Sequence, residues 1–198
     1  MTRIAVLVSG GGTNLQALID AQKENKLGGG ELSLVVSSVK DVYALDRAQK
    51  AGIKTITIAK KDYSDLSDFD AALKSVLSEN KIELVVLAGF LSVLGPAVLK
   101  KYKNKIINVH PSLIPAFCGK GFYGLKVHKA VIESGVKITG ATVHFVNEVV
   151  DGGKIILQKA IDVLPDDTPE TLQKRVMEEV EWVILPYAVE MFCKGEII

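Results

Sequence analysis

The stretch VLVSGGGTNLQALID, residues 6–20, runs from apolar residues through three consecutive glycines into a helical pattern. Glycines let the backbone approach a ligand closely, and the free N–H groups at the start of a helix favour an anion. The loop lacks the lysine of a Walker loop, and no glycine stands where the dinucleotide fingerprint GxGxxG needs its third one. The stretch therefore predicts an α/β protein that holds a monophosphate at this loop without magnesium, with Thr13 and Asn14 as additional side-chain donors. A tight strand-to-helix turn with no ligand is the alternative.

Unbroken apolar runs of the same kind recur in the first half of the chain, at residues 4–8, from Leu32 and from Glu83. Such runs suit strands that are covered on both faces, as in a parallel sheet. Helical patterns separate them, at residues 14–25, 42–51, 67–79 and 95–102. The alternation of strand and helix predicts a Rossmann-like, open and mostly parallel twisted sheet flanked by helices.

The pattern changes after the strand KIINV, residues 105–109. The runs GATVHFV and KIILQKAIDV have the character of strands, and NEVVDGG between them contains an Asp-Gly step that is typical of a hairpin. The C-terminal part is therefore predicted to add antiparallel strands to the sheet.

Composition excludes several classes of protein. The chain has 198 residues, a net charge of +1 and 48% apolar residues, so it is long enough to bury a core and lacks the basic excess of a nucleic-acid binder. No apolar run approaches the roughly 20 residues that span a bilayer. The two cysteines and three histidines show no metal-ligand spacing. Because a strand begins at once, we expect no signal peptide and a cytoplasmic protein.

The segment INVHPSLIP carries the sharpest chemical signal. Asn108 and His110 are two residues apart on a strand, so they point to the same face. Pro111 stops the strand and holds His110 extended. Both side chains then lie at the carboxyl end of a strand, where open α/β sheets bind ligands, and an amide beside an imidazole suits an oxyanion. The alternative is that both residues only satisfy the backbone of a turn.

Two acidic residues add to this set. Asp151 precedes two glycines, and as a bare turn residue it would need no further explanation. A last helix is predicted over residues 168–193, capped by Asp167 or Thr168 and kinked at Pro186. Glu181 has apolar helical neighbours, so it is expected to face inward, where a carboxylate needs a partner. A buried lysine or arginine pair is the structural alternative to a ligand.

Together these residues resemble the glycinamide ribonucleotide formyltransferases, folate-dependent enzymes of purine synthesis. The similarity runs over essentially the whole chain, through VLVSGGGTNLQALID, VVLAGFLSVLGP, INVHPSLIPAF, GATVHFV, DGGKIILQ and RVMEEVEWVILP. The combination of NVHPSLIP with the later HFV and DGG is highly specific to the formyltransferase superfamily. The resemblance implies one formyltransferase domain over residues 1–198, with a nucleotide-binding half over 1–105 and a catalytic and folate-binding half over 106–198.

The resemblance also implies a reaction and its residues. A formyl group would pass from the cosubstrate 10-formyltetrahydrofolate to the amine of glycinamide ribonucleotide, whose phosphate would lie at Gly12, Thr13 and Asn14 of the glycine loop. Glu181 would hold the ribose or glycinamide part. Asn108 and a protonated His110 would stabilise the oxyanion, and Asp151 would favour the charged imidazole and help to move the proton. The folate would contact Asn108 and the segment made of Phe90, Leu91, Ser92, Val93 and Leu94.

Several further expectations come from the resemblance. The Ile114–Pro115 bond is expected to be cis, and the partners are expected to be small molecules, with no metal, nucleic acid or membrane, in a monomer or weak homodimer. The chain departs from many relatives at Ser92, where they have arginine, and at Trp182, where they often have histidine. The segment CGKGFYG, Cys118–Gly124, is longer than in some relatives. No catalytic role is expected for Cys118.

Three rival functions were weighed. Methionyl-tRNA formyltransferase carries an additional C-terminal domain and a basic surface, and formyltetrahydrofolate hydrolase adds an N-terminal regulatory domain. A non-catalytic nucleotide-binding module would use the glycine loop alone and has no need of Asn108, His110 and Asp151. Turnover of 10-formyltetrahydrofolate with and without glycinamide ribonucleotide separates the transferase from a hydrolase and from a binding module.

Overall fold

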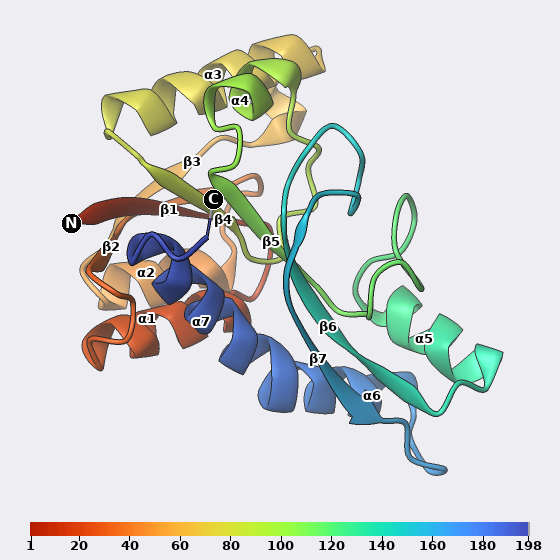
Figure 1. Ribbon diagram of the computed structural model, residues 1–198. Coiled ribbons are helices and arrows are strands. Elements are labelled where there is room, and N and C mark those ends of the chain that lie inside the picture. The colour runs from red at the N-terminus through yellow and green to blue at the C-terminus, as the bar shows by residue number, and fades with distance from the viewer. Residues whose placement is uncertain (198) are drawn as a thin grey trace.

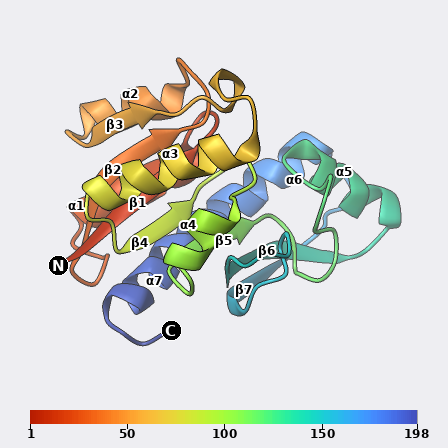
Figure 2. The same ribbon diagram turned by 90° about the horizontal axis from the view of Figure 1, so that it is seen from above.

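The computed structural model describes residues 1–197, and its centre is one twisted sheet of seven strands in the order β3-β2-β1-β4-β5-β6-β7 (Figures 1 and 2). Neighbouring strands from β3 to β5 run parallel, whereas β6 is antiparallel to β5 and β7 is antiparallel to β6. The strands are β1 Thr2–Val8, β2 Gly30–Ser37, β3 Lys54–Thr57, β4 Leu84–Leu87, β5 Ile106–His110, β6 Ile138–Phe145 and β7 Ile155–Asp162. The predicted fold class, including the antiparallel C-terminal strands, is confirmed.

Helices cover both faces of this sheet (Figure 1). Their bounds are α1 Thr13–Lys23, α2 Tyr43–Lys50, α3 Leu66–Glu79, α4 Pro96–Lys101, α5 Leu125–Ser134, α6 Pro169–Val176 and α7 Trp182–Cys193. A short 3-10 helix, η1, spans Lys60–Asp62, and a π-helical turn, η2, spans Met177–Glu181. Buried residues of α1, α2, α6 and α7 form one hydrophobic cluster with the sheet, and those of α3 and α4 form a second cluster on the opposite face.

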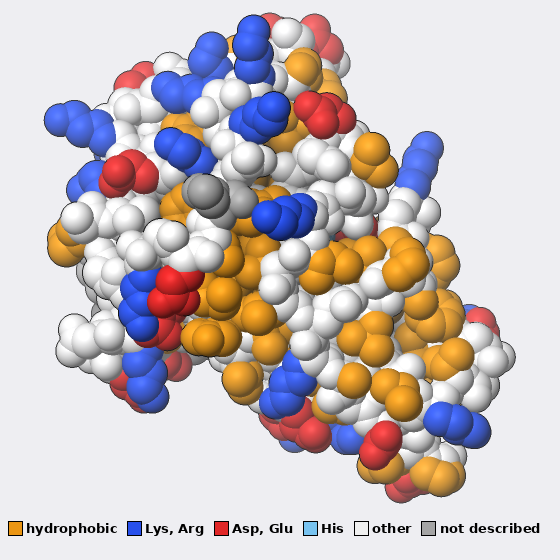
Figure 3. Space-filling model, in the orientation of Figure 1, with side chains coloured by type: hydrophobic (Ala, Val, Ile, Leu, Met, Phe, Trp, Pro, Cys, Tyr) orange, Lys and Arg blue, Asp and Glu red, His pale blue; other side chains and the backbone are white. Residues whose placement is uncertain are grey.

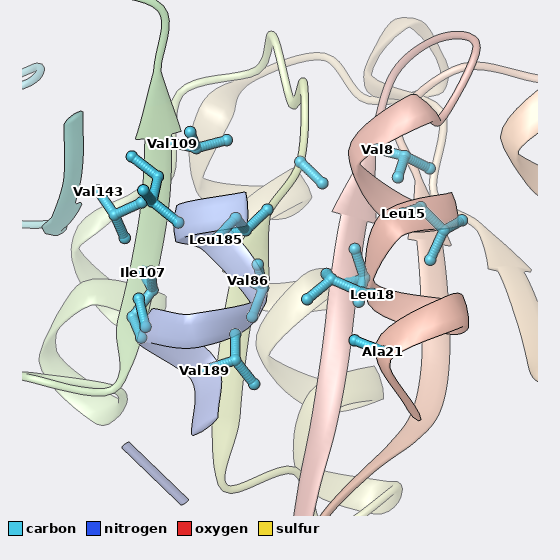
Figure 4. Close-up of a cluster of buried hydrophobic side chains, with 14 of the residues drawn as sticks. Val8, Leu15, Leu18, Ala21, Val86, Ile107, Val109, Val143, Leu185 and Val189 are labelled. Atoms are coloured by element: carbon cyan, nitrogen blue, oxygen red, sulfur yellow. The ribbon is translucent and has the colours of Figure 1, made fainter. Parts of the chain in front are cut away.

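Strand composition explains this layering. Val6, Val86 and Ile107 come from three neighbouring strands and are fully buried beneath the α1 and α7 face. Figure 4 shows Leu18 of α1 and Leu185 of α7 pointing into the same cluster. Alternate residues of the same strands supply the opposite cluster, so the strands are apolar on both faces, as parallel strands covered by helices must be.

The topology places a crevice beside β1. Successive strands step from β1 to β2 and β3 in one direction, and the chain then returns to place β4 on the other side of β1. At such a switch point the loops after the two central strands part in opposite directions, and open α/β sheets bind ligands there. The glycine loop follows β1, and the segment 88–94 follows β4, so both lie at this crevice.

The last helical region differs from its prediction. Thr168 caps it, with its side chain accepting from the backbone of Thr171. The region departs from α-helical geometry at η2, and α7 then runs through Pro186. Because proline has no N–H, it cannot bond the carbonyl of residue 182, and the wide π turn ends directly before that residue. The sequence did not predict this irregular turn at Met177–Glu181, and the kink at Pro186 stays a prediction.

The surface of the protein carries both hydrophobic and charged side chains. Figure 3 shows hydrophobic side chains gathered over the middle of one face, with Lys and Arg side chains standing over α3 and α4. Within the described part of the chain, no helix combines the length and apolar character needed to cross a membrane.

Candidate active site

The glycine loop joins β1 to α1, and its residues Gly10 and Gly11 are exposed. Gly12 is the N-cap residue of α1 in a left-handed conformation, with φ of 73°, and no side chain of the described residues caps the helix. The first turn contains no acidic residue. The N–H groups of that turn, which an α-helix cannot satisfy internally, are therefore left for an anion.

Asn108 and His110 lie near the end of β5, as the strand spacing predicts. His110 is only 5% exposed, and Asn108 is half-buried. The chain turns directly afterwards, and the Ile114–Pro115 bond is cis, as the resemblance implies. The hydroxyl of Thr142 on β6 accepts from the backbone N–H of Ile114 at 3.0 Å, which fixes the turn against the neighbouring strand.

Asp151 reaches this strand end from the loop between β6 and β7. Its carboxylate oxygens lie 3.5 Å from His110 Nδ1 and 3.7 Å from His144 Nε2. The backbone N–H of Gly119 donates to Asp151 Oδ2 at 2.8 Å. Asp151 has a φ of 55°, a left-handed conformation that aspartate tolerates better than most residues. The loop therefore holds the carboxylate between two imidazoles.

The environment of Asp151 favours its charged form. Burial alone would raise the pKa of this carboxyl, but the contact with His144, the charge of His110 and the N–H of Gly119 together hold its pKa below the usual value. Asp151 therefore stays ionised and can stabilise positive charge on either ring.

His144 is a site residue that the sequence analysis missed. It is paired with Asn108 across the β5–β6 ladder, so both side chains lie on one face of the sheet. His144 Nδ1 lies 2.8 Å from the carbonyl of Phe145, which can only accept, so Nδ1 carries a hydrogen. In the neutral ring Nε2 then accepts from Asn108 Nδ2 at 3.1 Å. This contact fixes the Asn108 amide and leaves its second N–H free to donate.

The loop after β5 also contacts His110. Its Nε2 lies 3.0 Å from the carbonyl of Phe117, a residue with a φ of 50°. A carbonyl and a carboxylate both accept hydrogen bonds, so both ring nitrogens of His110 face acceptors. A ligand that accepts from Nε2 must replace the Phe117 carbonyl.

Glu181 faces inward, but its partner is not a cation. It is 6% exposed and accepts a hydrogen bond of 2.6 Å from Asn14 Nδ2, at the start of α1. No lysine or arginine among the described residues forms an ion pair with it, so the structural alternative of a buried cation pair is wrong. Burial raises the pKa of Glu181 to about 7, although the bond from Asn14 opposes this rise.

One cavity of about 510 Å³ joins these groups. A cavity of this size is typical of small-molecule sites. Its lining includes every predicted site residue except Gly12: Thr13, Asn14, Phe90, Leu91, Ser92, Val93, Leu94, Asn108, His110, Asp151 and Glu181. Four apolar side chains that line it are more than half exposed, which suits a flat apolar ligand: Leu91, Val93, Val149 and Val150.

The two edges of the crevice are tied together. The hydroxyl of Ser9, at the start of the glycine loop, accepts from the backbone N–H of Leu91 at 2.9 Å and lies 2.7 Å from the hydroxyl of Ser38. This contact ties the glycine loop to the apolar segment after β4.

Other candidates play smaller parts. Cys118 is half-buried and donates to the carbonyl of Pro115, and burial together with the charge of Asp151 raises its pKa, so it is not an activated thiolate. Trp182 is half-buried and lies outside the cavity lining. Among residues 1–197, no group of three or more His, Cys, Asp or Glu side chains is placed to hold a metal ion.

His128 of α5 is a second residue that the sequence analysis missed. It is fully buried at the cavity wall, and neither ring nitrogen has a hydrogen-bond partner among the described residues. Burial, together with the charge of His110, lowers its pKa to about 4. His128 is therefore neutral near pH 7.

Comparison with known proteins shows the family of this chain. The formyl transferase family model matches residues 2–189. Phosphoribosylglycinamide formyltransferase of Haemophilus influenzae is 38% identical over all of this chain and 90% of its own length. The crystal structure of glycinamide ribonucleotide transformylase 1 from Symbiobacterium toebii is 41% identical, with a TM-score of 0.94, and covers 100% of this chain and 90% of that one.

A further relative is much longer. The trifunctional purine biosynthetic protein adenosine-3 of Gallus gallus is 45% identical over 98% of this chain, which spans only 19% of that protein. The similarity to the full-length bacterial proteins covers the glycine loop, the β5 strand end and the last helix alike. The chain therefore belongs to the formyl transferase family, as one of its phosphoribosylglycinamide formyltransferases.

Proposed function

We propose that this protein transfers the formyl group of 10-formyltetrahydrofolate to the amine of glycinamide ribonucleotide, in purine biosynthesis. The observation that carries the proposal is that one cavity contains an uncapped helix start, a pair of oxyanion donors and an apolar wall. These parts match a phosphate, a reacting carbonyl and a flat ring system respectively.

The ribonucleotide binds at the α1 side of the cavity. Its phosphate lies against the N–H groups of Gly12, Thr13 and Asn14, where the helix dipole favours negative charge. Glu181 and Asn14, already joined at 2.6 Å, then contact the ribose or glycinamide part. This binding mode places the amine of the ribonucleotide near the end of β5.

The folate binds at the β4 side. Its ring system packs against Leu91 and Val93 from one edge and against Val149 and Val150 from the other, and these exposed side chains lose their contact with water on binding. Backbone groups of the 90–94 segment supply hydrogen bonds. Ser92 lines the same cavity and offers the folate a hydroxyl group.

The reaction follows from the groups at the formyl carbon. The neutral amine attacks that carbon, and the carbonyl oxygen becomes an oxyanion that accepts from Asn108 Nδ2 and from His110 Nε2. For this, the formyl oxygen takes the place of the Phe117 carbonyl at His110. Collapse of the tetrahedral adduct breaks the bond to folate N10, which gains the proton that the attacking amine loses.

Asp151 supports the charged state of the site. It stays ionised beside His110 and stabilises the imidazolium that donates to the oxyanion, and it accepts or relays the proton of the amine, directly or through water. His144 positions the Asn108 amide for the same purpose. In this proposal the protein is cytoplasmic and acts as a monomer or weak homodimer. Its substrates are these two small molecules, and it uses no metal.

The test is to follow the folate product with each substrate present or absent. Formation of tetrahydrofolate only when glycinamide ribonucleotide is present supports the transferase. Folate turnover without the amine would indicate a hydrolase. Binding of the ribonucleotide with no turnover would indicate a binding module.

A further inference from the structure

Arg47 of α2 makes an unusual contact with the glycine loop. Its Nε donates to the carbonyl of Gly11 at 2.9 Å, and its Nη1 donates to Gln16 Oε1 at 2.9 Å. The guanidinium also lies over the ring of Tyr43, 4.7 Å from the centroid. The side chain is therefore fixed on three sides, and one of its contacts is a backbone carbonyl of the phosphate loop.

A second bond from the same helix acts on the neighbouring peptide. The backbone N–H of Ala44 donates to the carbonyl of Gly10 at 3.2 Å. The loop lies close to α2 here: a Cβ atom added to Gly12 would be only 2.6 Å from the Cβ of Ala44. Two successive carbonyls of the loop are thus both held by α2.

The planar trans peptide turns this into a statement about the N–H groups. In each peptide unit the C=O and the following N–H point in opposite directions. Holding the carbonyls of Gly10 and Gly11 toward α2 therefore directs the N–H groups of Gly11 and Gly12 away from it, as an anion-binding loop requires.

Without these two hydrogen bonds, little else in the loop would hold its peptides in this orientation. The Gly11–Gly12 peptide lies between two residues without Cβ atoms, and glycine adopts positive and negative φ with similar ease. Rotation of this peptide would present its carbonyl oxygen, instead of an N–H, to the phosphate. The partial negative charge of that oxygen would repel the anion.

We propose that Arg47 is a positioning residue for the phosphate of the substrate: it fixes the Gly11–Gly12 peptide so that its N–H faces the anion. This inference rests on the proposed function. Arg47 acts through the backbone and not by touching the phosphate, so its Nε donor matters more than its charge.

Two substitutions separate the donor from the charge. Arg47→Gln removes the charge but keeps an amide nitrogen at the chain position of Nε, whereas Arg47→Met keeps similar length with neither donor nor charge. Lys50→Met is the matched control, because Lys50 is a neighbouring exposed cation of α2 that also lies over Tyr43, with no contact to the loop. Thermal unfolding of each variant checks that it folds.

The readouts are the dissociation constants of glycinamide ribonucleotide and of the same compound without its phosphate, with the KM for the folate. Arg47→Met should weaken ribonucleotide binding about 10-fold, the effect of one lost hydrogen bond to the loop. It should leave the other two values unchanged. Arg47→Gln should recover most of the affinity, and Lys50→Met should match the wild type.

The inference is overturned if Arg47→Met binds the ribonucleotide as tightly as the wild type. It is also overturned if Arg47→Gln is as weak as Arg47→Met, which would make charge the cause, or if both ligands weaken in parallel, which would indicate general damage. Failure of the wild type to bind the ribonucleotide would instead refute the proposed function, and the inference with it.

Discussion

The amide of Asn14 donates a 2.6 Å hydrogen bond to the buried carboxyl of Glu181, which is 167 residues away in the sequence. This bond joins the first turn of α1 to the π-helical turn before α7. Both residues line the cavity, so the bond joins two parts of its wall. It also leaves a carboxyl group buried without a compensating cation among the described residues.

That burial predicts a pH-dependent stability. Because the pKa of Glu181 is raised from 4.5 to about 7, the unfolded chain ionises first, and stability falls as pH rises from about 4.5 through 7. The size of the fall is about 3 kcal/mol. Urea unfolding at pH 4.5 and 8 should show this loss in the wild type and not in Glu181→Gln, while the exposed control Glu178→Gln behaves as the wild type. Parallel profiles for all three proteins would contradict the buried, unpaired carboxyl.

Glu181 should also affect one substrate selectively. Glu181→Ala removes a contact made equally in the ground and transition states, so the KM for glycinamide ribonucleotide should rise about 10-fold. The KM for the folate and the turnover number should stay nearly constant. If both KM values stay at the wild-type level while the protein melts earlier, Glu181 is a structural residue only.

The burial of His128 should make the stability of the protein depend on pH in the opposite direction. Its pKa is lowered from 6.5 to about 4, so the unfolded chain binds the proton first, and stability falls as pH drops from about 6.5 through 4. Since neither nitrogen has a described partner, His128→Leu leaves no polar atom unsatisfied and should flatten this part of the profile. Unfolding measured at pH 7 and 4 tests this, and an unchanged acid slope in His128→Leu would show that other groups cause it.

Asp151 should matter for turnover more than for binding. Asp151→Asn keeps the size and tolerates the same left-handed backbone, but it removes the charge beside both imidazoles. We expect turnover to fall on the order of 10²-fold, in the range of lost acid–base assistance, with little change in either KM. Asp166→Asn, an exposed acidic residue between β7 and α6, is the control for net charge. Turnover near the wild-type rate would reduce the proposed trio to Asn108 and His110.

Metal removal is expected to have no effect. In the proposed function the phosphate is held by backbone N–H groups of an uncapped helix, and this loop has no Walker lysine that would accompany bound magnesium. Activity after dialysis against EDTA should equal the untreated value. Loss of activity, restored by a divalent cation, would show that the glycine loop has been misinterpreted.

Much of the fold follows from the sequence because it depends on local pattern. Apolar runs covered by helices predict the parallel strands, and the glycine loop and the β5 strand end are short local signals. The spacing of Asn108 and His110 gives their common face, since side chains alternate along a strand. The Asp-Gly step likewise predicts the hairpin that contains Asp151.

Other parts depend on pairing across the chain. β3 is a four-residue polar strand, and α5 follows a glycine-rich segment that hides its start, so both were missed. His144 becomes part of the site only through its register opposite Asn108. The alternation of side chains along GATVHFV could have placed Thr142 and His144 on one face of the sheet. It could not have shown which neighbouring strand those two residues lie against. The partner of Glu181 was equally out of reach, because a packing contact between distant helices leaves no local pattern.

In the proposed function, the groups at the end of β5 transfer a formyl group between two bound molecules. The decisive measurement uses 10-formyltetrahydrofolate that carries an isotopic label in the formyl carbon, incubated with the protein and glycinamide ribonucleotide. We expect the label to appear in the ribonucleotide in amounts equal to the tetrahydrofolate formed, and His110→Ala to abolish both. Label released as free formate at the same rate with or without the ribonucleotide would contradict it.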